Sequence, residues 1–255
     1  MQNLLTKLEV ADFEFLLEII RGPVSLTSDK QLRAALDAFS TATDSGQPSR
    51  LCEIVEREIR YLGSSDAAYV FRKMTGRGSG PGVPFQEIIH DVYRKLKHDT
   101  PKGLFTDEEL LENLVQVHTS MRMRKMPLEQ QRALLETVGM SAGDIGTYLK
   151  SNASRFAIPA LIQVAGVTAT QRIVTNAVIG TVTGYVGRQT AKNLIGQLAA
   201  RFPVWAEWLG PIAWGITGLW TVYDIQGPAA RKTVPLTLYI GLCMLRDGGL
   251  GGTDA

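Results

Sequence analysis

The feature that most constrains the fold is an apolar stripe that returns every three or four residues along the first part of the chain. One stripe runs from residue 10 to residue 20 and stops at Gly22 and Pro23, and another covers residues 51–62. This spacing places the apolar side chains on one face of an α-helix. No stretch of useful length alternates between apolar and polar residues, as a strand would. The sequence therefore predicts an all-α fold.

Signals for the start of helices agree with this prediction. Ser28 with Gln31, and Thr106 with Glu109, have the residue types and spacing of capping boxes, in which each side chain satisfies a backbone N–H of the first turn. Apolar stripes follow both pairs. We interpret residues 1–150 as an N-terminal bundle of amphipathic helices.

Charged residues are distributed unevenly between this bundle and the rest of the chain. The protein has 27 Lys and Arg against 25 Asp and Glu, a net charge of +2, which argues against a dedicated nucleic-acid binder. Residues 156–245 contain few of these charges: Arg172, Arg188, Lys192, Arg201, Glu207, Asp224, Arg231 and Lys232. We therefore divide the chain into the bundle (1–150), an apolar helical hairpin region (151–246) and a flexible tail (247–255).

The hairpin region is rich in glycine and tryptophan. Gly180 and Gly184 lie four positions apart in a charge-free run, so on a helix they form a smooth patch that a second helix can approach closely. The region also contains all four tryptophans of the chain: Trp205, Trp208, Trp214 and Trp220.

Two interpretations of the hairpin region remain open. It can be the central apolar hairpin of a soluble domain, because no charge-free run reaches the roughly 18–20 residues of a membrane-spanning helix. It can also meet a membrane, because tryptophans favour the interface and basic side chains suit anionic headgroups. The two interpretations are compatible if the hairpin is buried in the soluble protein and is released when the protein meets a membrane. The predicted contact residues are Gly180, Gly184, Arg188, Lys192, Trp205, Trp208, Trp214, Trp220, Arg231 and Lys232.

No motif supports an enzyme active site. The glycine-rich residues 76–82 lack the Gly-Lys-Ser/Thr ending of a phosphate-binding loop. Glu87 and His90 have the spacing of a di-iron ligand pair, but the second such motif is missing. Nothing places a base beside Cys52. We expect no catalytic residue, cofactor or metal, and we expect both cysteines to be buried free thiols.

Several segments resemble the YaaW-like family of bacterial proteins, which is related to the ubiquinol–cytochrome c chaperone domain. The segments that carry the resemblance are Ala11–Leu16, Glu58–Gly63, Ile88–Leu96, Met126–Arg132, Gly210–Trp214, Gly227–Arg231 and Thr233–Pro235. The resemblance implies an all-α fold and brings no catalytic residues. The chaperone relationship implies protein binding through residues 50–140.

These observations favour a non-enzymatic helical protein whose apolar hairpin engages or inserts into the inner membrane, in envelope stress or a cell-killing defence response. The alternative is a soluble assembly chaperone that shields an apolar protein client. The expected partners are therefore anionic lipid or such a client, and a homo-oligomer is compatible with either. The N-terminus lacks the apolar core of a signal peptide, so we expect a cytoplasmic protein at or in the inner membrane.

Overall fold

The computed structural model describes residues 1–21, 27–41, 50–64, 82–150, 158–186, 196 and 230–248. Within these ranges the chain forms eleven helices and contains no strand, which confirms the all-α prediction for them. The helices are α1 (Gln2–Leu5), α2 (Val10–Ile20), α3 (Asp29–Thr41), α4 (Arg50–Leu62), α6 (Phe85–Lys95), α7 (Asp107–Lys125), α8 (Leu128–Thr137), α9 (Ala142–Lys150), α10 (Ile158–Ala165), α11 (Val167–Val186) and α14 (Ala230–Gly248).

Local signals set several helix starts as predicted. Thr106 Oγ1 accepts a hydrogen bond from the Glu109 N–H at 3.2 Å, and Glu109 Oε2 accepts one from the Thr106 N–H at 2.8 Å. The capping box at the start of α7 is therefore confirmed. At the start of α3, the Gln31 N–H donates to Ser28 Oγ at 3.4 Å, which is one half of the second predicted box.

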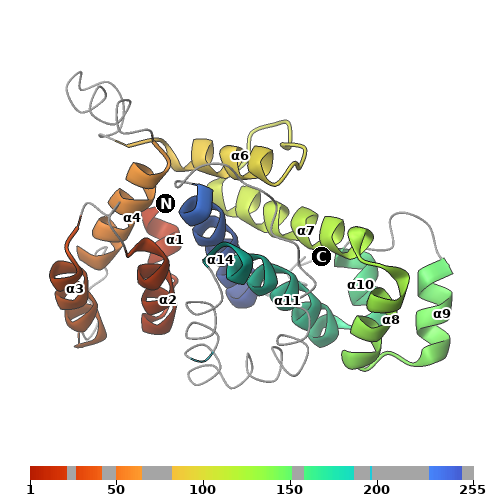
Figure 1. Ribbon diagram of the computed structural model, residues 1–255. Coiled ribbons are helices and arrows are strands. Elements are labelled where there is room, and N and C mark those ends of the chain that lie inside the picture. Colours follow the sequence, from red (N-terminus) through yellow and green to blue (C-terminus); the bar gives the residue numbers. More distant parts are fainter. Residues whose placement is uncertain are drawn as a thin grey trace.

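The centre of the molecule is formed by α7, α11 and α14 (Figure 1). Helix α14 packs against α11 and α7, and it also contacts α2, α4 and α6. In Figure 1, α1–α4 lie on one side of this centre and α8–α10 on the other. Buried residues from both sides of residue 150 belong to one hydrophobic core. The predicted boundary at residue 150 thus separates two parts of the chain that differ in composition but contribute to the same core.

The two long helices of the apolar region are buried because their neighbours cover them. Most side chains of α11 from Ala169 to Thr183 are inaccessible to solvent, and so are those of α14 from Thr233 to Leu245. Arg172 is the one charged residue within α11. Within the described ranges, no helix has both the length and the apolar composition needed to cross a membrane. Cys52 and Cys243 are buried, as predicted, and neither is part of a disulfide.

Helix α7 approaches α14 closely at Gly241. A Cβ atom added there would lie 2.8 Å from Val115 Cγ2 and 3.0 Å from the Leu111 carbonyl oxygen, both on α7. The sequence predicted a glycine contact of this kind at Gly180 and Gly184. Gly180 is buried in α11 and Gly184 is half-buried, whereas Gly241 was not identified.

Candidate functional site

The predicted contact residues fall into two groups. Arg188, Lys192, Trp205, Trp208, Trp214 and Trp220 lie outside the described residues. The other four belong to the two central helices, with Gly180 and Gly184 on α11 and Arg231 and Lys232 at the start of α14. Arg231 is exposed, while Lys232 is half-buried.

Lys232 makes its contacts inside the molecule. Its Nζ donates to the Ile20 carbonyl oxygen at 2.6 Å and to the Arg21 carbonyl oxygen at 3.1 Å, at the end of α2. A cation there satisfies carbonyls that have no partner in the helix and opposes the negative end of the helix dipole. Burial lowers the pKa of Lys232, and the nearby Glu58 carboxylate acts in the opposite direction. The ammonium thus fixes the start of α14 to the end of α2.

A buried carboxylate, Asp12, joins α2 to the other end of α14. Asp12 is 0% exposed, and Arg246 donates to both of its oxygens, at 3.0 Å to Oδ1 and 2.8 Å to Oδ2. Tyr239 Oη donates to Oδ1 at 2.9 Å, and Cys243 Sγ lies 3.5 Å from the same oxygen. The Glu9 N–H donates to Oδ2 at 3.0 Å, so Asp12 also closes the first turn of α2.

Side-chain spacing explains why these groups converge. Tyr239, Cys243 and Arg246 lie four and three positions apart, so they occupy one face of α14. The ring of Tyr239 stacks on Phe15, with centroids 3.9 Å apart. Burial raises the pKa of Tyr239 well above its usual value, and Cys243 and Asp12 add to the rise. The phenol therefore stays protonated and donates to Asp12.

A second network joins α7 to α11 through the buried His118, which also contacts the half-buried His98 in the loop after α6. His98 Nε2 lies 3.1 Å from His118 Nδ1, and His118 Nε2 lies 2.8 Å from Thr181 Oγ1. Thr181 Oγ1 donates to the Ala177 carbonyl oxygen at 2.9 Å. Because that hydroxyl has one proton, it accepts from His118 Nε2–H. His118 Nδ1 then accepts from His98 Nε2–H, and His98 Nδ1 carries a lone pair.

The buried position of this pair keeps both rings neutral. Burial lowers the pKa of His98 to about 4, and the Lys125 charge acts in the same direction. Burial also lowers the pKa of His118 well below its usual range, with smaller effects in the same direction from His98 and Arg122. A proton added to His118 would place a charge in the buried contact between α7 and α11, and one added to His98 would place a charge in a partly desolvated position.

Acid should therefore weaken the fold through these histidines. In the unfolded chain His98 protonates near pH 6.5, but in the folded state only near pH 4. The unfolded state binds more protons between these values, so the free energy of unfolding decreases as the pH falls from about 6.5 to 4. Urea unfolding at several pH values should show a shallower decrease in His98→Gln than in the wild type. His90→Gln, at the remaining histidine, is the matched control, and equal pH slopes in all three proteins would refute the assignment.

The Asp12 network joins α2 to α14, and the histidine network joins α7 to α11. Cys243 is buried, and its Sγ lies beside the Asp12 carboxylate. Glu87 and His90 lie on α6, and the described part of the chain contains no group of three or more His, Cys, Asp or Glu side chains that would hold a metal ion. Sequence reasoning missed the Asp12 network. Two signals in the sequence could have indicated it: Asp12 is an acidic residue within the apolar stripe at residues 10–20, and Arg246 follows the charge-free residues 233–245.

Comparison with known proteins identifies a distant relative. No protein-family model and no solved structure matches the chain. The chain is 29% identical over 201 residues to the UPF0174 protein of Helicobacter pylori (strain J99 / ATCC 700824), a match that spans 78% of this chain and 72% of that protein. That name states no activity, and the resemblance to the YaaW-like family and its chaperone relationship stays an interpretation. The chain is thus a distant homologue of the UPF0174 protein.

Proposed function

We propose that the chain is a non-enzymatic helical protein that binds the surface of an anionic membrane through residues 187–229. The observation that carries the proposal is the burial of α11 and α14, the helices on either side of this segment. Asp12, His118 and Lys232 each provide a polar contact that holds one of them in the core. Membrane binding by the intervening segment leaves these contacts intact, whereas insertion of α11 and α14 would break them.

The composition of residues 187–229 suits an interface. All four tryptophans lie in this segment, and tryptophan rings favour the headgroup level of a bilayer. Arg188, Lys192 and Arg201 supply positive charge, and each such residue near an anionic surface contributes about 1 kcal/mol of attraction. Under this proposal the protein acts at the cytoplasmic face of the inner membrane as a peripheral protein.

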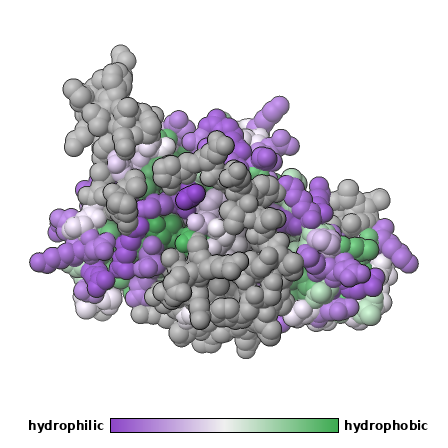
Figure 2. Space-filling view, viewed as in Figure 1, coloured by the Kyte–Doolittle hydropathy of each residue, from purple (hydrophilic) through white to green (hydrophobic). Residues whose placement is uncertain are grey.

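The surface around the central helices is consistent with a protein that is folded before it binds. Figure 2 shows hydrophilic residues over much of the described surface in this view, with smaller hydrophobic patches on the side of α8–α10 and on the side of α1–α4. The large exposed apolar residues of α8, α10 and α11 are Leu128, Val164 and Val167. The main apolar faces of α11 and α14 are inside.

Vesicle co-sedimentation tests the proposal. The wild type should bind vesicles that contain phosphatidylglycerol, and added salt should weaken the binding. The triple variant Arg188→Gln/Lys192→Gln/Arg201→Gln should bind on the order of 100-fold more weakly, since about 1 kcal/mol per charge multiplies across three sites. Lys30→Gln/Arg33→Gln, on the exposed face of α3, is the control and should bind as the wild type does.

Other outcomes separate the alternatives. Equal binding by the triple variant and the wild type would contradict the role of this segment. Indifference to anionic vesicles at low salt, together with a defined protein that co-purifies in stable proportion, would favour the assembly chaperone instead.

A further inference from the structure

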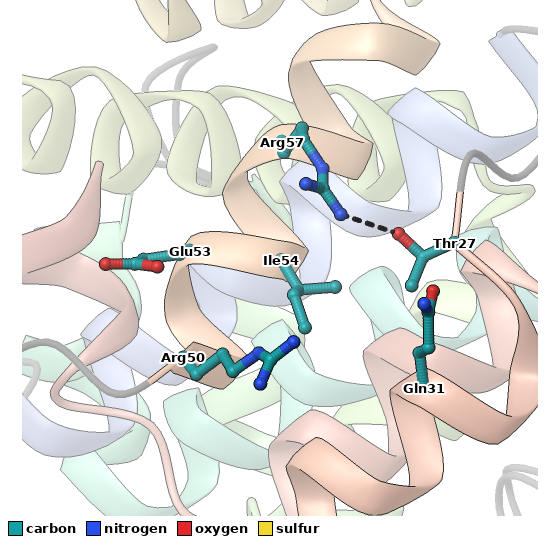
Figure 3. A pocket seen from close by; sticks show the side chains of 6 residues that line it. All are labelled: Thr27, Gln31, Arg50, Glu53, Ile54 and Arg57. Atoms are coloured by element: carbon teal, nitrogen blue, oxygen red, sulfur yellow. Dashed lines mark hydrogen bonds between the residues drawn. The ribbon is translucent and has the colours of Figure 1, made fainter.

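A polar pocket lies between α3 and α4, away from the central helices. It has a volume of about 210 Å³ and is lined by Thr27, Gln31, Arg50, Glu53, Ile54 and Arg57 (Figure 3). In Figure 3 the guanidinium groups of Arg50 and Arg57 point towards the side that holds Thr27 and Gln31, whereas the Glu53 carboxylate points the other way. The pocket therefore gathers polar side chains from α3 and α4 and from Thr27, which lies two residues before α3.

Helical spacing brings the two arginines to one face of α4. Arg50, Ile54 and Arg57 lie four and three positions apart, so they share a face, and the neighbouring Leu51 and Val55 are buried in the core. Packing of α4 against α3 places Gln31 opposite this face. The same amphipathic pattern that buries α4 thus presents Arg50 and Arg57 at the pocket.

Neither arginine is neutralised by a carboxylate of the described residues. Arg57 donates to Thr27 Oγ1 at 3.0 Å, and this is a contact with a neutral hydroxyl. By contrast, Arg21, Arg60 and Arg246 each have a carboxylate partner, respectively Glu18, Glu56 and Asp12. Two guanidinium groups therefore face one concave space with most of their donors available.

We propose that this pocket binds a phosphate group. A guanidinium presents planar N–H donors in a fork that matches the oxygens of a phosphate, and two forks match its double negative charge. Gln31 adds an amide donor, and Ile54 offers an apolar contact for the carbon adjoining the phosphate. Glu53 reduces the positive charge of the lining and so limits the affinity. The phosphate group belongs either to a small phosphorylated molecule or to the headgroup of an acidic phospholipid.

Titration of the full-length protein with inorganic phosphate and pyrophosphate tests the proposal. Isothermal calorimetry should show saturable binding that weakens about tenfold in Arg57→Gln and in Arg50→Gln, as expected for the loss of one charge-assisted hydrogen bond. Glu53→Gln should bind more tightly than the wild type because a repelling charge is removed. Arg33→Gln, an exposed arginine of α3 outside the pocket, should bind as the wild type does.

A vesicle arm distinguishes the two sources of phosphate. It uses the Arg188→Gln/Lys192→Gln/Arg201→Gln background, so that its result is independent of the membrane-binding segment proposed above. The protein with this background should then be compared with one that also carries Arg50→Gln and Arg57→Gln. If only the first binds phosphatidic acid vesicles, the pocket binds a lipid headgroup. Saturation by the soluble anions alone assigns it to a small phosphorylated molecule. Absence of saturable binding in both arms, or equal weakening by Arg33→Gln, overturns the proposal, provided that unfolding curves show the variants to be folded.

Discussion

Replacing Asp12 with alanine is expected to destabilise the protein by about 3–5 kcal/mol, the usual result of removing one partner from a buried ion pair. The change leaves the guanidinium of Arg246, with 13% of its side chain exposed, without its carboxylate. It also leaves the Tyr239 hydroxyl without its acceptor and opens the first turn of α2. An unfolding curve in urea, followed by far-UV circular dichroism, measures the loss.

The design of this experiment separates the ion pair from a general effect of mutation. Asp37→Asn, at an exposed position of α3, is the matched control and should change the free energy of unfolding by less than about 0.5 kcal/mol. Asp12→Leu combined with Arg246→Met should recover much of the stability, because two apolar side chains leave no buried charge unpaired. A loss of less than about 1 kcal/mol in Asp12→Ala would show that α14 is not held by this pair.

Replacing Gly241 with alanine is expected to destabilise the protein by about 1–3 kcal/mol through overpacking. The added methyl group would meet the Leu111 carbonyl oxygen at 3.0 Å as well as a Val115 methyl group at 2.8 Å. A side chain can adopt another rotamer, but the backbone of α7 can move only if the whole contact with α14 opens. Gly241→Leu should cost more than Gly241→Ala for the same reason.

The chain offers a matched glycine for comparison. Gly146 lies in α9, and a Cβ atom added there has no neighbour within 4 Å. Gly146→Ala should therefore leave stability unchanged or raise it by about 0.5–1 kcal/mol, since alanine favours the helix. Thermal melting of the two alanine variants gives the comparison. Equal melting temperatures would show that α14 and α7 are not in close contact at Gly241.

The positions of the helices could be predicted from the sequence because their signals are local. The stripe at residues 10–20 and the capping box at Thr106 and Glu109 each depend on residues within one or two turns of each other, and the structure confirms both. The scarcity of charge between residues 156 and 245 likewise indicated two helices that avoid water. The sequence therefore determined the helices and their apolar faces.

Only the tertiary structure decided what covers those faces. The open question was whether the apolar helices form a core or face lipid, and the periodicity of α11 and α14 is the same in both cases. The structure places them against α7 and α2, and it pairs Asp12 with Arg246 across 234 positions and His118 with Thr181 across 63. Helical periodicity is set by neighbours three and four positions apart, whereas the partner of each face is set by packing between distant segments, which no local pattern records.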